Sequence, residues 1–501
     1  MINTTHIFSS DIGMTFGIEK CAKVTLKKGK QIYANNINLT QDLTVQDLDQ
    51  ETNYKYLGIE ESGNISHEKM KEKIRKEFYR RVRKVIKTDL NSKNKMMAIN
   101  SLAIPVVTYS YNIINWRLSE IKQMDVKVRK ILTINKMHHP KADIDRMYLP
   151  RSEGGRGMLQ LENAYKISTI GLNWYLANAN EPFLKCIYQQ DKTKKLYSIT
   201  RQNEKFRDEI NLSNYKDIET DNKSAAEKAK RIKSKSKLLM KNLLKEKWKN
   251  KPLHGQFLKR ITAPSVSLEL STQWLNSSGL KGETEGLILA AQDQSLATNN
   301  YKTNISKTEN DDKCRICKLR SETIDHIVAG CPVLAPTEYM ERHNKIGKYL
   351  HWHICKSENI EVNKKWYKHQ PEPVTENENC TILWDFGIHT DKMIPANRPD
   401  IIIKYKEEKQ CILIDMSVPC DANITTKEFE KKSKYKNLEI EIQRMWQMKT
   451  KVVPIVVGAL GTVTKDFESC VKLLPETISS NEIQKIALLG TAHILRKILS
   501  I

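Results

Sequence analysis

Residues 398–420 read R-P-D-I-I-I-K-Y-K-E-E-K-Q-C-I-L-I-D-M-S-V-P-C, and the segment K-K-S-K-Y follows at 431–435. Within this stretch, residues 401–405 and 410–416 are short, mostly aliphatic runs separated by charged residues. Runs of this length with β-branched residues predict a hairpin of two largely buried strands. We therefore expect the C-terminal part of the chain to contain a β-sheet built around this hairpin.

Two carboxylates flank the predicted hairpin. Asp400 comes just before the first strand and Asp415 ends the second, so both would lie at one end of the hairpin. Burying unpaired charge is costly, and two neighbouring carboxylates repel each other. Mg²⁺ relieves this repulsion, because it takes carboxylate oxygens and leaves positions for water and phosphate. A lysine at 431, 432 or 434 would then stabilise charge on the phosphate. The alternative is structural: Asp400 caps a turn and Asp415 pairs with a lysine.

The composition points to a polyanionic partner. The chain has 501 residues, with 83 Lys and Arg against 59 Asp and Glu, a net charge of +24. Such a surplus favours nucleic-acid binding, since phosphate contacts dominate that affinity. No apolar run is long enough to span a membrane, and the first residues lack the pattern of a signal peptide. We expect an intracellular protein with no membrane partner and no small-molecule substrate.

A compact metal motif follows the middle of the chain. Its four potential ligands are spaced Cys314-x2-Cys317-x8-His326-x4-Cys331. This spacing predicts a tetrahedral Zn²⁺ site, and a closed set of four ligands leaves no open position for catalysis. The predicted zinc knuckle is therefore structural or binds nucleic acid. Three further histidines lie in an amphipathic helical pattern just after it and are expected to be core or surface residues: His343, His351 and His353.

Two basic helices are predicted in the first half of the chain. Residues after Ser66 show an apolar helical stripe, with Arg80 and Arg81 on the opposite face. Residues 223–251 carry twelve Lys or Arg against two Glu, with a thin apolar stripe along them. Backbone binding to RNA or DNA is the preferred interpretation of both faces, and a solvated helix or an anionic membrane surface is the alternative. In the second helix the candidate contacts are Lys230, Arg231, Lys233 and Lys237.

The order of motifs resembles a known family. The sequence G-I-E-K-C at 17–21 and Y-K-Y-L-G at 54–58 resemble the last two palm motifs of reverse transcriptases from non-LTR retrotransposons. The resemblance implies that Lys20 lies in the motif credited with protonating pyrophosphate and that residues 56–58 form the primer grip. The aromatic-Ala-Asp-Asp motif of that family is missing here, so polymerisation is expected only as part of a longer protein.

The C-terminal part resembles the restriction-like endonuclease of site-selective elements in the same family. In those elements a Cys-Cys-His-Cys knuckle directly precedes R/K-P-D, a second acid and K-x-x-Y. This chain has the same motifs in the same order. The usual superfamily lysine, two residues past the second acid, is replaced here by Ser417. The resemblance implies Asp400 and Asp415 as Mg²⁺ ligands, and it makes Lys432 the catalytic lysine and Tyr435 an active-site helper. Lys431 stays open as a substitute, and Arg398 is expected to bind DNA phosphate.

We therefore predict a multidomain α+β protein with a mostly helical thumb and linker, a small zinc knuckle, and a C-terminal α/β restriction-endonuclease-like domain of PD-(D/E)xK type. The expected function is Mg²⁺-dependent nicking of target DNA, with element RNA as second partner and the nucleus as location. The alternative is an inactive remnant that only binds nucleic acid. The expected segments are a palm remnant (1–62), a thumb (63–135), a basic linker (136–305), the knuckle with its following helix (306–370), the endonuclease (380–480) and a last helix (481–501).

Overall fold

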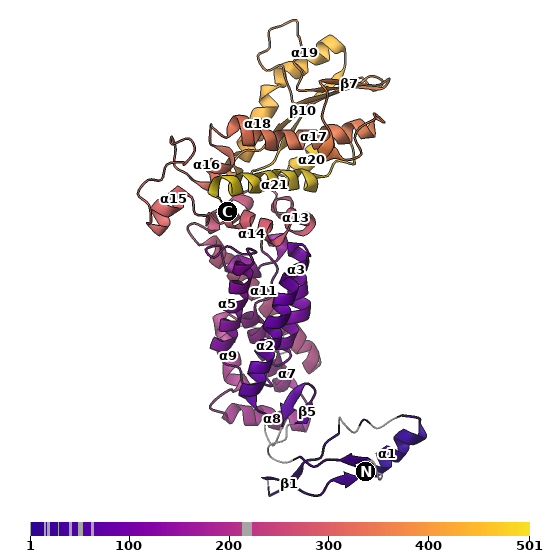
Figure 1. Cartoon of the computed structure of the whole chain (residues 1–501), viewed down its shortest axis with the longest axis vertical. Coiled ribbons are helices and arrows are strands. Elements are labelled where there is room, and N and C mark those ends of the chain that lie inside the picture. Colours follow the sequence, from indigo (N-terminus) through magenta and orange to yellow (C-terminus); the bar gives the residue numbers. More distant parts are fainter. Residues whose placement is uncertain are drawn as a thin grey trace. The chain divides into compact units, whose positions relative to one another are not determined.

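The computed structural model describes residues 2–14, 17, 21–28, 30–39, 43–48, 54–61, 65–212 and 223–500. The fold is mixed α+β, as expected, with many helices and a five-stranded sheet (Figure 1). The chain divides into two compact units, each built from several segments. Unit 1 contains residues 1–84, 101–126 and 161–236, and unit 2 contains 85–100, 127–160 and 237–501. Within the described residues, no helix has the length and apolarity needed to cross a membrane.

Unit 1 is helical apart from short hairpins near its beginning. Its elements are α1 (Ile2–Asp11), β1 (Thr25–Lys27), β2 (Lys30–Ile32), β3 (Ile37–Asn38), β4 (Thr44–Val45), β5 (Tyr54–Tyr56), β6 (Ile59–Glu61), α4 (Ile104–Thr108), α7 (Leu161–Asn178), α8 (Pro182–Thr193) and α9 (Ile199–Glu209). Four helical elements contribute residues to both units: α2 (His67–Ile86), η2 (Ile99–Ala103), α5 (Leu118–Ile134) and α11 (Ala225–Lys249).

The predicted helix after Ser66 is confirmed as α2. Met70, Ile74, Phe78 and Val82 recur at helical spacing and are all buried. This stripe buries one face of the helix and leaves its basic face outward. Before it, β5 and β6 pair as a hairpin with Leu57 and Gly58 in its turn. Lys20 lies outside the described residues, so its expected role stays a prediction.

Unit 2 holds the remaining elements. These are α3 (Ser92–Ala98), α6 (Asp145–Tyr148), η3 (Arg151–Glu153), α12 (Gly255–Ile261), α13 (Leu268–Ser277), α14 (Gly282–Gln292), α15 (Asn299–Tyr301), η4 (Lys302–Ser306), α16 (Ile324–Ala329), η5 (Ala335–Tyr339), α17 (Met340–Ser357), η6 (Trp366–Lys368), β7 (Val374–Glu376), β8 (Cys380–Trp384), β9 (Ile401–Tyr405), β10 (Gln410–Ser417), η7 (Asp421–Asn423), α18 (Ile424–Lys434), α19 (Lys436–Trp446), β11 (Lys449–Val456), α20 (Phe467–Val471) and α21 (Ser480–Leu499).

The five-stranded sheet has the order β11-β10-β9-β8-β7. Strands β9 and β10 form the predicted antiparallel hairpin, and β11 returns parallel to β10 after the helices α18 and α19. The predicted sequence of strand, strand, helix and strand is thus confirmed, although the helical region is two helices that meet at Tyr435. Parallel pairing needs such a crossover connection.

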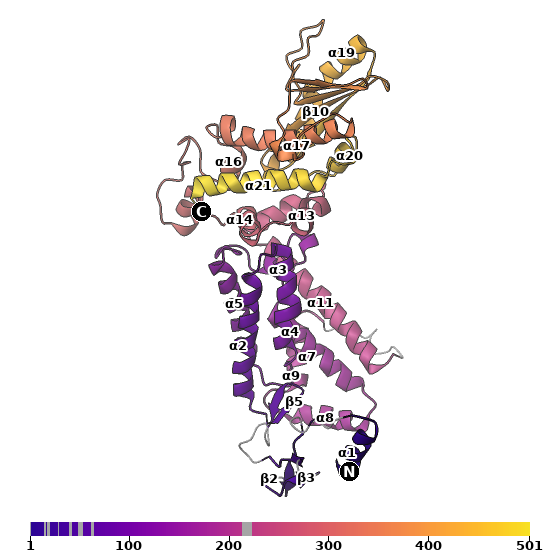
Figure 2. The same cartoon turned by 45° about the vertical axis from the view of Figure 1, so that its right-hand side comes forward.

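Both faces of the sheet are covered, which explains the continuous apolar runs in its strands. Ile401 and Ile403 face one core together with Ile346 and Leu350 of α17. Ile402 faces a second core, which α19 closes. Helix α21 runs beside α17 in both views (Figures 1 and 2), and the Arg342 guanidinium donates a 2.8 Å hydrogen bond to the Thr491 hydroxyl between them.

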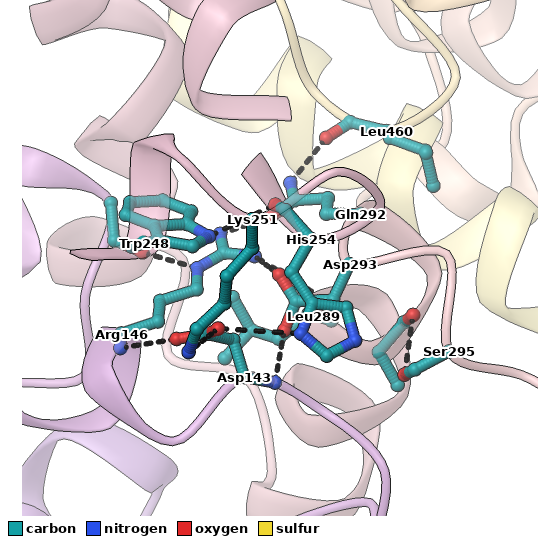
Figure 3. Close-up of polar contacts among 12 residues, drawn as sticks. Asp143, Arg146, Trp248, Lys251, His254, Leu289, Gln292, Asp293, Ser295 and Leu460 are labelled. Carbon is teal, nitrogen blue, oxygen red and sulfur yellow. Dashed lines mark hydrogen bonds and ion pairs between the residues drawn. The ribbon is translucent and has the colours of Figure 1, made fainter. Parts of the chain in front are cut away.

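A buried charged network ties together distant parts of unit 2 (Figure 3). The Arg146 guanidinium pairs with the Asp293 carboxylate at 2.8 Å, and both side chains are almost fully buried. The ring centroid of Trp248 lies 4.8 Å from the guanidinium carbon. The Asp293 carboxylate also accepts a 3.0 Å hydrogen bond from the backbone amide of Asp143. Asp143 in turn pairs with Lys251. Because each buried charge has partners, this network can lie inside a protein core.

Candidate active site and candidate metal centre

The two carboxylates expected at the hairpin end come together in the structure. Asp400 directly precedes β9, and Asp415 lies near the end of β10. The Asp400 carboxylate accepts a 2.6 Å hydrogen bond from the backbone amide of Met416, the residue after Asp415. Antiparallel pairing of Ile401 with Ile414 places these two strand ends side by side. Asp415 is buried, whereas the side chain of Asp400 is 21% exposed.

The electrostatics of the two acids differ. Burial raises the pKa of Asp415 above its usual value, and the neighbouring Asp400 carboxylate adds to this, outweighing the opposite effects of Lys431 and Tyr435. Burial also favours a higher pKa for Asp400, but the hydrogen bond and charge of His343, the Met416 amide and Lys431 bring its pKa below the usual value. The pair therefore favours one charged and one more easily protonated carboxyl group.

Lys431, and not Lys432, reaches the acidic pair. The Lys431 ammonium forms an ion pair with the Asp415 carboxylate. Lys432, to which the resemblance assigned the catalytic role, pairs with Glu428 at 2.8 Å and lies 3.5 Å from Asp466 instead. The buried stripe of α18 explains the difference, because Ile424 and Glu428 recur at helical spacing and the next position on that face is 431. Position 432 lies at the edge of this stripe, where its side chain is exposed, whereas that of Lys431 is partly buried.

Tyr435 also lies at the acidic pair. Its side chain is buried, and its hydroxyl donates a 3.0 Å hydrogen bond to the backbone carbonyl of Arg398. Burial raises the pKa of Tyr435, and the Asp415 carboxylate raises it further. The phenol therefore remains a neutral donor. Arg398 itself is exposed and bound to Asp385, with 2.8 Å from its Nε to the Asp385 carbonyl oxygen. Its expected phosphate contact stays a prediction, and the charge of Arg398 is partly neutralised by Asp385.

Helix α17 adds a histidine that the sequence pattern assigned to the core or the surface. The Nε2 atom of His343 lies 3.2 Å from an Asp400 carboxylate oxygen. Burial favours a lower pKa for His343, but the hydrogen bond and charge of Asp400 raise its pKa above the usual value. A signal for this position exists in the sequence, since His343, Ile346 and Leu350 share one helical face. Because that face packs on the sheet, its first turn meets the strand end.

A cavity of about 440 Å³ opens beside the acidic pair. Asp400, Lys431 and His343 contribute to its wall, together with Arg342. The Arg342 side chain is buried, and one of its guanidinium nitrogens donates to the Val418 carbonyl at 3.3 Å. The cavity thus combines two carboxylates, those of Asp385 and Asp400, with three side chains that carry or can carry positive charge. Its chemistry suits an anionic group held near a carboxylate.

The predicted zinc ligands also converge. The ligand atoms of Cys314, Cys317, His326 and Cys331 all lie within 4.8 Å of one another, so the cluster could bind a metal such as zinc. The Sγ atom of Cys317 is 3.4 Å from Nε2 of His326. Three thiols and one imidazole are a donor set that suits Zn²⁺ in a structural site.

Local hydrogen bonds hold the four ligands in place. The Cys314 amide donates to the Arg320 carbonyl at 2.8 Å and closes the first turn. The Thr323 hydroxyl accepts from the His326 amide at 3.1 Å and caps α16, which carries the histidine. The Tyr339 hydroxyl accepts a 3.1 Å hydrogen bond from the Cys331 amide. The pKa of Cys317 is lowered, since backbone amides and neighbouring thiols outweigh the effect of burial.

The basic residues expected to bind nucleic acid fall into two groups. Arg80 and Arg81 both pair with Glu77, at 2.6 and 2.7 Å, so part of their charge is already neutralised. Four exposed residues of α11 form the second group: Lys230, Arg231, Lys233 and Lys237. Lys230 and Lys233 line a groove of about 560 Å³ in unit 1, together with Tyr175 of α7.

Comparison of the chain with protein-family models and with curated protein sequences found no match.

Proposed function

We propose that this chain nicks DNA by hydrolysing one phosphodiester bond, with the cavity beside Asp400 as the active site. The observation that carries the proposal is the convergence of Asp400, Asp415 and Lys431, which come from two strand ends and the following helix. Two carboxylates beside one ammonium at the end of a sheet suit phosphodiester hydrolysis, because they can bind a divalent cation and stabilise the phosphate. The cavity next to them has room for a phosphate and its neighbours.

The donor set fits Mg²⁺. Asp400 and Asp415 offer hard oxygen ligands, and the partly exposed Asp400 opens into the cavity, where water and phosphate oxygens could supply further ligands. When bound, Mg²⁺ would act as a Lewis acid on the phosphate and lower the pKa of a coordinated water. Lys431 neutralises Asp415 and remains close enough to interact with a phosphate oxygen. The two acids would thus hold the cation while the lysine faces the substrate.

The other residues have roles that follow from their contacts. In hydrolysis, a water oxygen attacks the phosphorus, the bond from phosphorus to the 3′-oxygen breaks, and that oxygen takes up a proton from solvent to leave as a hydroxyl. Lys431 and Arg342 stabilise the extra negative charge on the phosphate. His343 can hold the proton that the attacking water releases, because its Nε2 atom lies beside Asp400 at the cavity wall. Tyr435 contacts Asp415 and helps to orient its carboxyl group.

The wider function that we propose is target-primed reverse transcription. A nick that leaves a 3′-hydroxyl supplies a primer, and the zinc cluster and the basic face of α11 would bind target DNA and element RNA. In this proposal the chain acts as the C-terminal part of a retrotransposon reverse transcriptase, in the nucleus. The polymerase step would need residues outside this chain.

The rival function is nucleic-acid binding without cleavage. It is favoured by one observation, the direct ion pair between Asp415 and Lys431, which would serve equally well as a structural contact. A non-cleaving remnant would keep the zinc cluster and the basic groove. It would bind DNA in a salt-sensitive manner and leave supercoiled DNA intact in every divalent cation.

A plasmid-nicking assay on the full chain separates the two functions. We expect conversion of supercoiled to relaxed plasmid in Mg²⁺, with loss of activity in Asp400→Asn and Asp415→Asn. Asp391→Asn is the matched control, since Asp391 is an exposed acid that pairs with Arg444 away from the cavity. Nicking that survives unchanged in both active-site variants would refute the proposal.

A further inference from the structure

A second cluster of metal-ligating side chains lies inside unit 2. His351, Cys355 and His369 are all buried, and one ligand atom from each lies within 4.8 Å of the others. His351 and Cys355 are four residues apart on α17 and therefore share one face of that helix. His369 follows the short helix η6 and returns to this face. Two imidazoles and one thiol are ligands that Zn²⁺ prefers.

The distances in the second cluster resemble those in the first. The Cys355 Sγ atom is 3.4 Å from His351 Nδ1, the same separation as between Cys317 Sγ and His326 Nε2. Nε2 of His369 lies 2.8 Å from His351 Nδ1. Bonds of ~2.0–2.3 Å to a tetrahedral Zn²⁺ place ligand atoms roughly 3.3–3.8 Å apart. A small outward movement of one imidazole would therefore complete the geometry.

Hydrogen bonding alone leaves this cluster poorly satisfied. Both His369 Nε2 and Cys355 Sγ approach the same atom, Nδ1 of His351. In a neutral imidazole that nitrogen has either one N–H group or one lone pair, so it can form only one good hydrogen bond to its two neighbours. Buried polar groups usually have partners, and a cation would satisfy all three inward-facing atoms together.

We propose that His351, Cys355 and His369 bind a second zinc ion, which fastens α17 to the segment after η6. Three protein ligands leave a fourth position for water or for a further thiol. Cys380 of β8 is the nearby candidate, because its thiol is fully buried in the same core as Cys355. This site is independent of the nuclease proposal. It would stabilise the C-terminal half of α17, whose first turn carries Arg342 and His343.

Metal content of the purified full chain tests the proposal. Mass spectrometry should find two zinc ions per chain, and Cys355→Ser and His369→Asn should each lower this to one. Cys411→Ser is the matched control, since Cys411 is a buried thiol in the other core of the sheet; it should keep two. One zinc in the unchanged chain, or two in Cys355→Ser and His369→Asn alike, would overturn the second site.

Cobalt substitution gives a second readout, which begins with the unchanged chain and therefore needs no variant for its first measurement. The first cluster offers three thiolates and the second one or two, so the sulfur-to-cobalt charge-transfer absorption of a fully loaded chain should exceed that of a three-thiolate site. In Cys355→Ser the absorption should fall to the three-thiolate level, and Cys411→Ser should leave it unchanged. Equal absorption in the unchanged chain and in Cys355→Ser would contradict the proposal.

Discussion

The ammonium of Lys431 forms an ion pair with the carboxylate of Asp415, across the short distance between α18 and the end of β10. This contact neutralises a carboxylate that is buried beside a second one, Asp400. A buried charge of this kind is stable only with a partner. The same ammonium borders the cavity, so it can serve both the fold and a bound phosphate.

Separate replacement of the two neighbouring lysines distinguishes their roles. We expect Lys431→Ala to reduce the nicking rate by about 10²–10³-fold, the usual effect of removing one group that stabilises transition-state charge. Lys432→Ala should retain most of the activity, because Lys432 pairs with Glu428 and Asp466 away from the acidic pair. Initial rates of plasmid relaxation at saturating Mg²⁺ measure the difference. A larger loss of nicking rate in Lys432→Ala than in Lys431→Ala would assign the catalytic role to Lys432.

The pH dependence of stability should depend on Asp143. Burial favours a higher pKa for this acid, but hydrogen bonds from His254 and Lys251 outweigh it and lower the pKa from 3.8 to about 2. A lowered pKa stabilises the folded state above the unfolded value, and this contribution is lost as the pH falls through the folded value. The thermal midpoint of Asp143→Asn should therefore lie below that of the unchanged chain at pH 7. The gap should narrow as the pH falls from about 4 toward 2.

Asp391→Asn is the control for this pH series, because Asp391 is an exposed acid. Its midpoint should follow that of the unchanged chain throughout. A gap for Asp143→Asn that stays constant with pH would show that the stabilisation from Asp143 is not electrostatic.

The buried pair in Figure 3 should be costly to break from one side. Asp293→Ala leaves the Arg146 guanidinium buried without its carboxylate, and we expect a loss of about 3–5 kcal/mol in the free energy of unfolding of unit 2. Asp293→Leu combined with Arg146→Met should cost much less, since an apolar pair leaves no uncompensated charge. Denaturant titration followed by tryptophan fluorescence reports on the region, because Trp248 stacks on Arg146.

Removal of a knuckle ligand should release one metal ion and weaken its surroundings. Cys331→Ser should lose one zinc equivalent and lower the thermal midpoint, because a metal bound by the four ligands would join α16 to the turn at Cys314. Cys186→Ser, which removes an exposed thiol, should change neither value. A knuckle variant that keeps its full zinc content would contradict the assignment of these four ligands.

Nucleic-acid binding should depend on the lysines of the α11 groove. Replacing Lys230 and Lys233 with alanine should weaken binding uniformly across sequences and reduce the salt slope by about 1 for each phosphate that is no longer neutralised. Lys241 and Lys245 form a matched control pair, since both already bind Glu153 at 2.8 and 3.0 Å. Fluorescence anisotropy with labelled RNA and DNA at several salt concentrations measures both quantities. Equal losses from the two pairs would argue against a specific groove.

The local elements and one candidate metal cluster could be predicted from the amino-acid sequence alone. The hairpin of β9 and β10, the buried stripe of α2 and the spacing of the four knuckle ligands depend on residues close together in the chain. Periodicity of two or 3.6 residues and the ligand spacing of a turn are local properties, so they can be seen without a fold. The same local pattern predicts that Asp400 and Asp415 lie at one end of the hairpin.

The residues that meet across separate elements could be identified only from the packed fold. The choice of Lys431 over Lys432, the contact of His343 with Asp400 and the cluster of His351 with His369 each join segments that are apart in the chain. The rotation of a helix about its own axis decides which of two consecutive side chains faces the sheet. Consecutive side chains point in directions about 100° apart around that axis. That rotation follows from how the apolar faces of α17 and α18 pack on the strands.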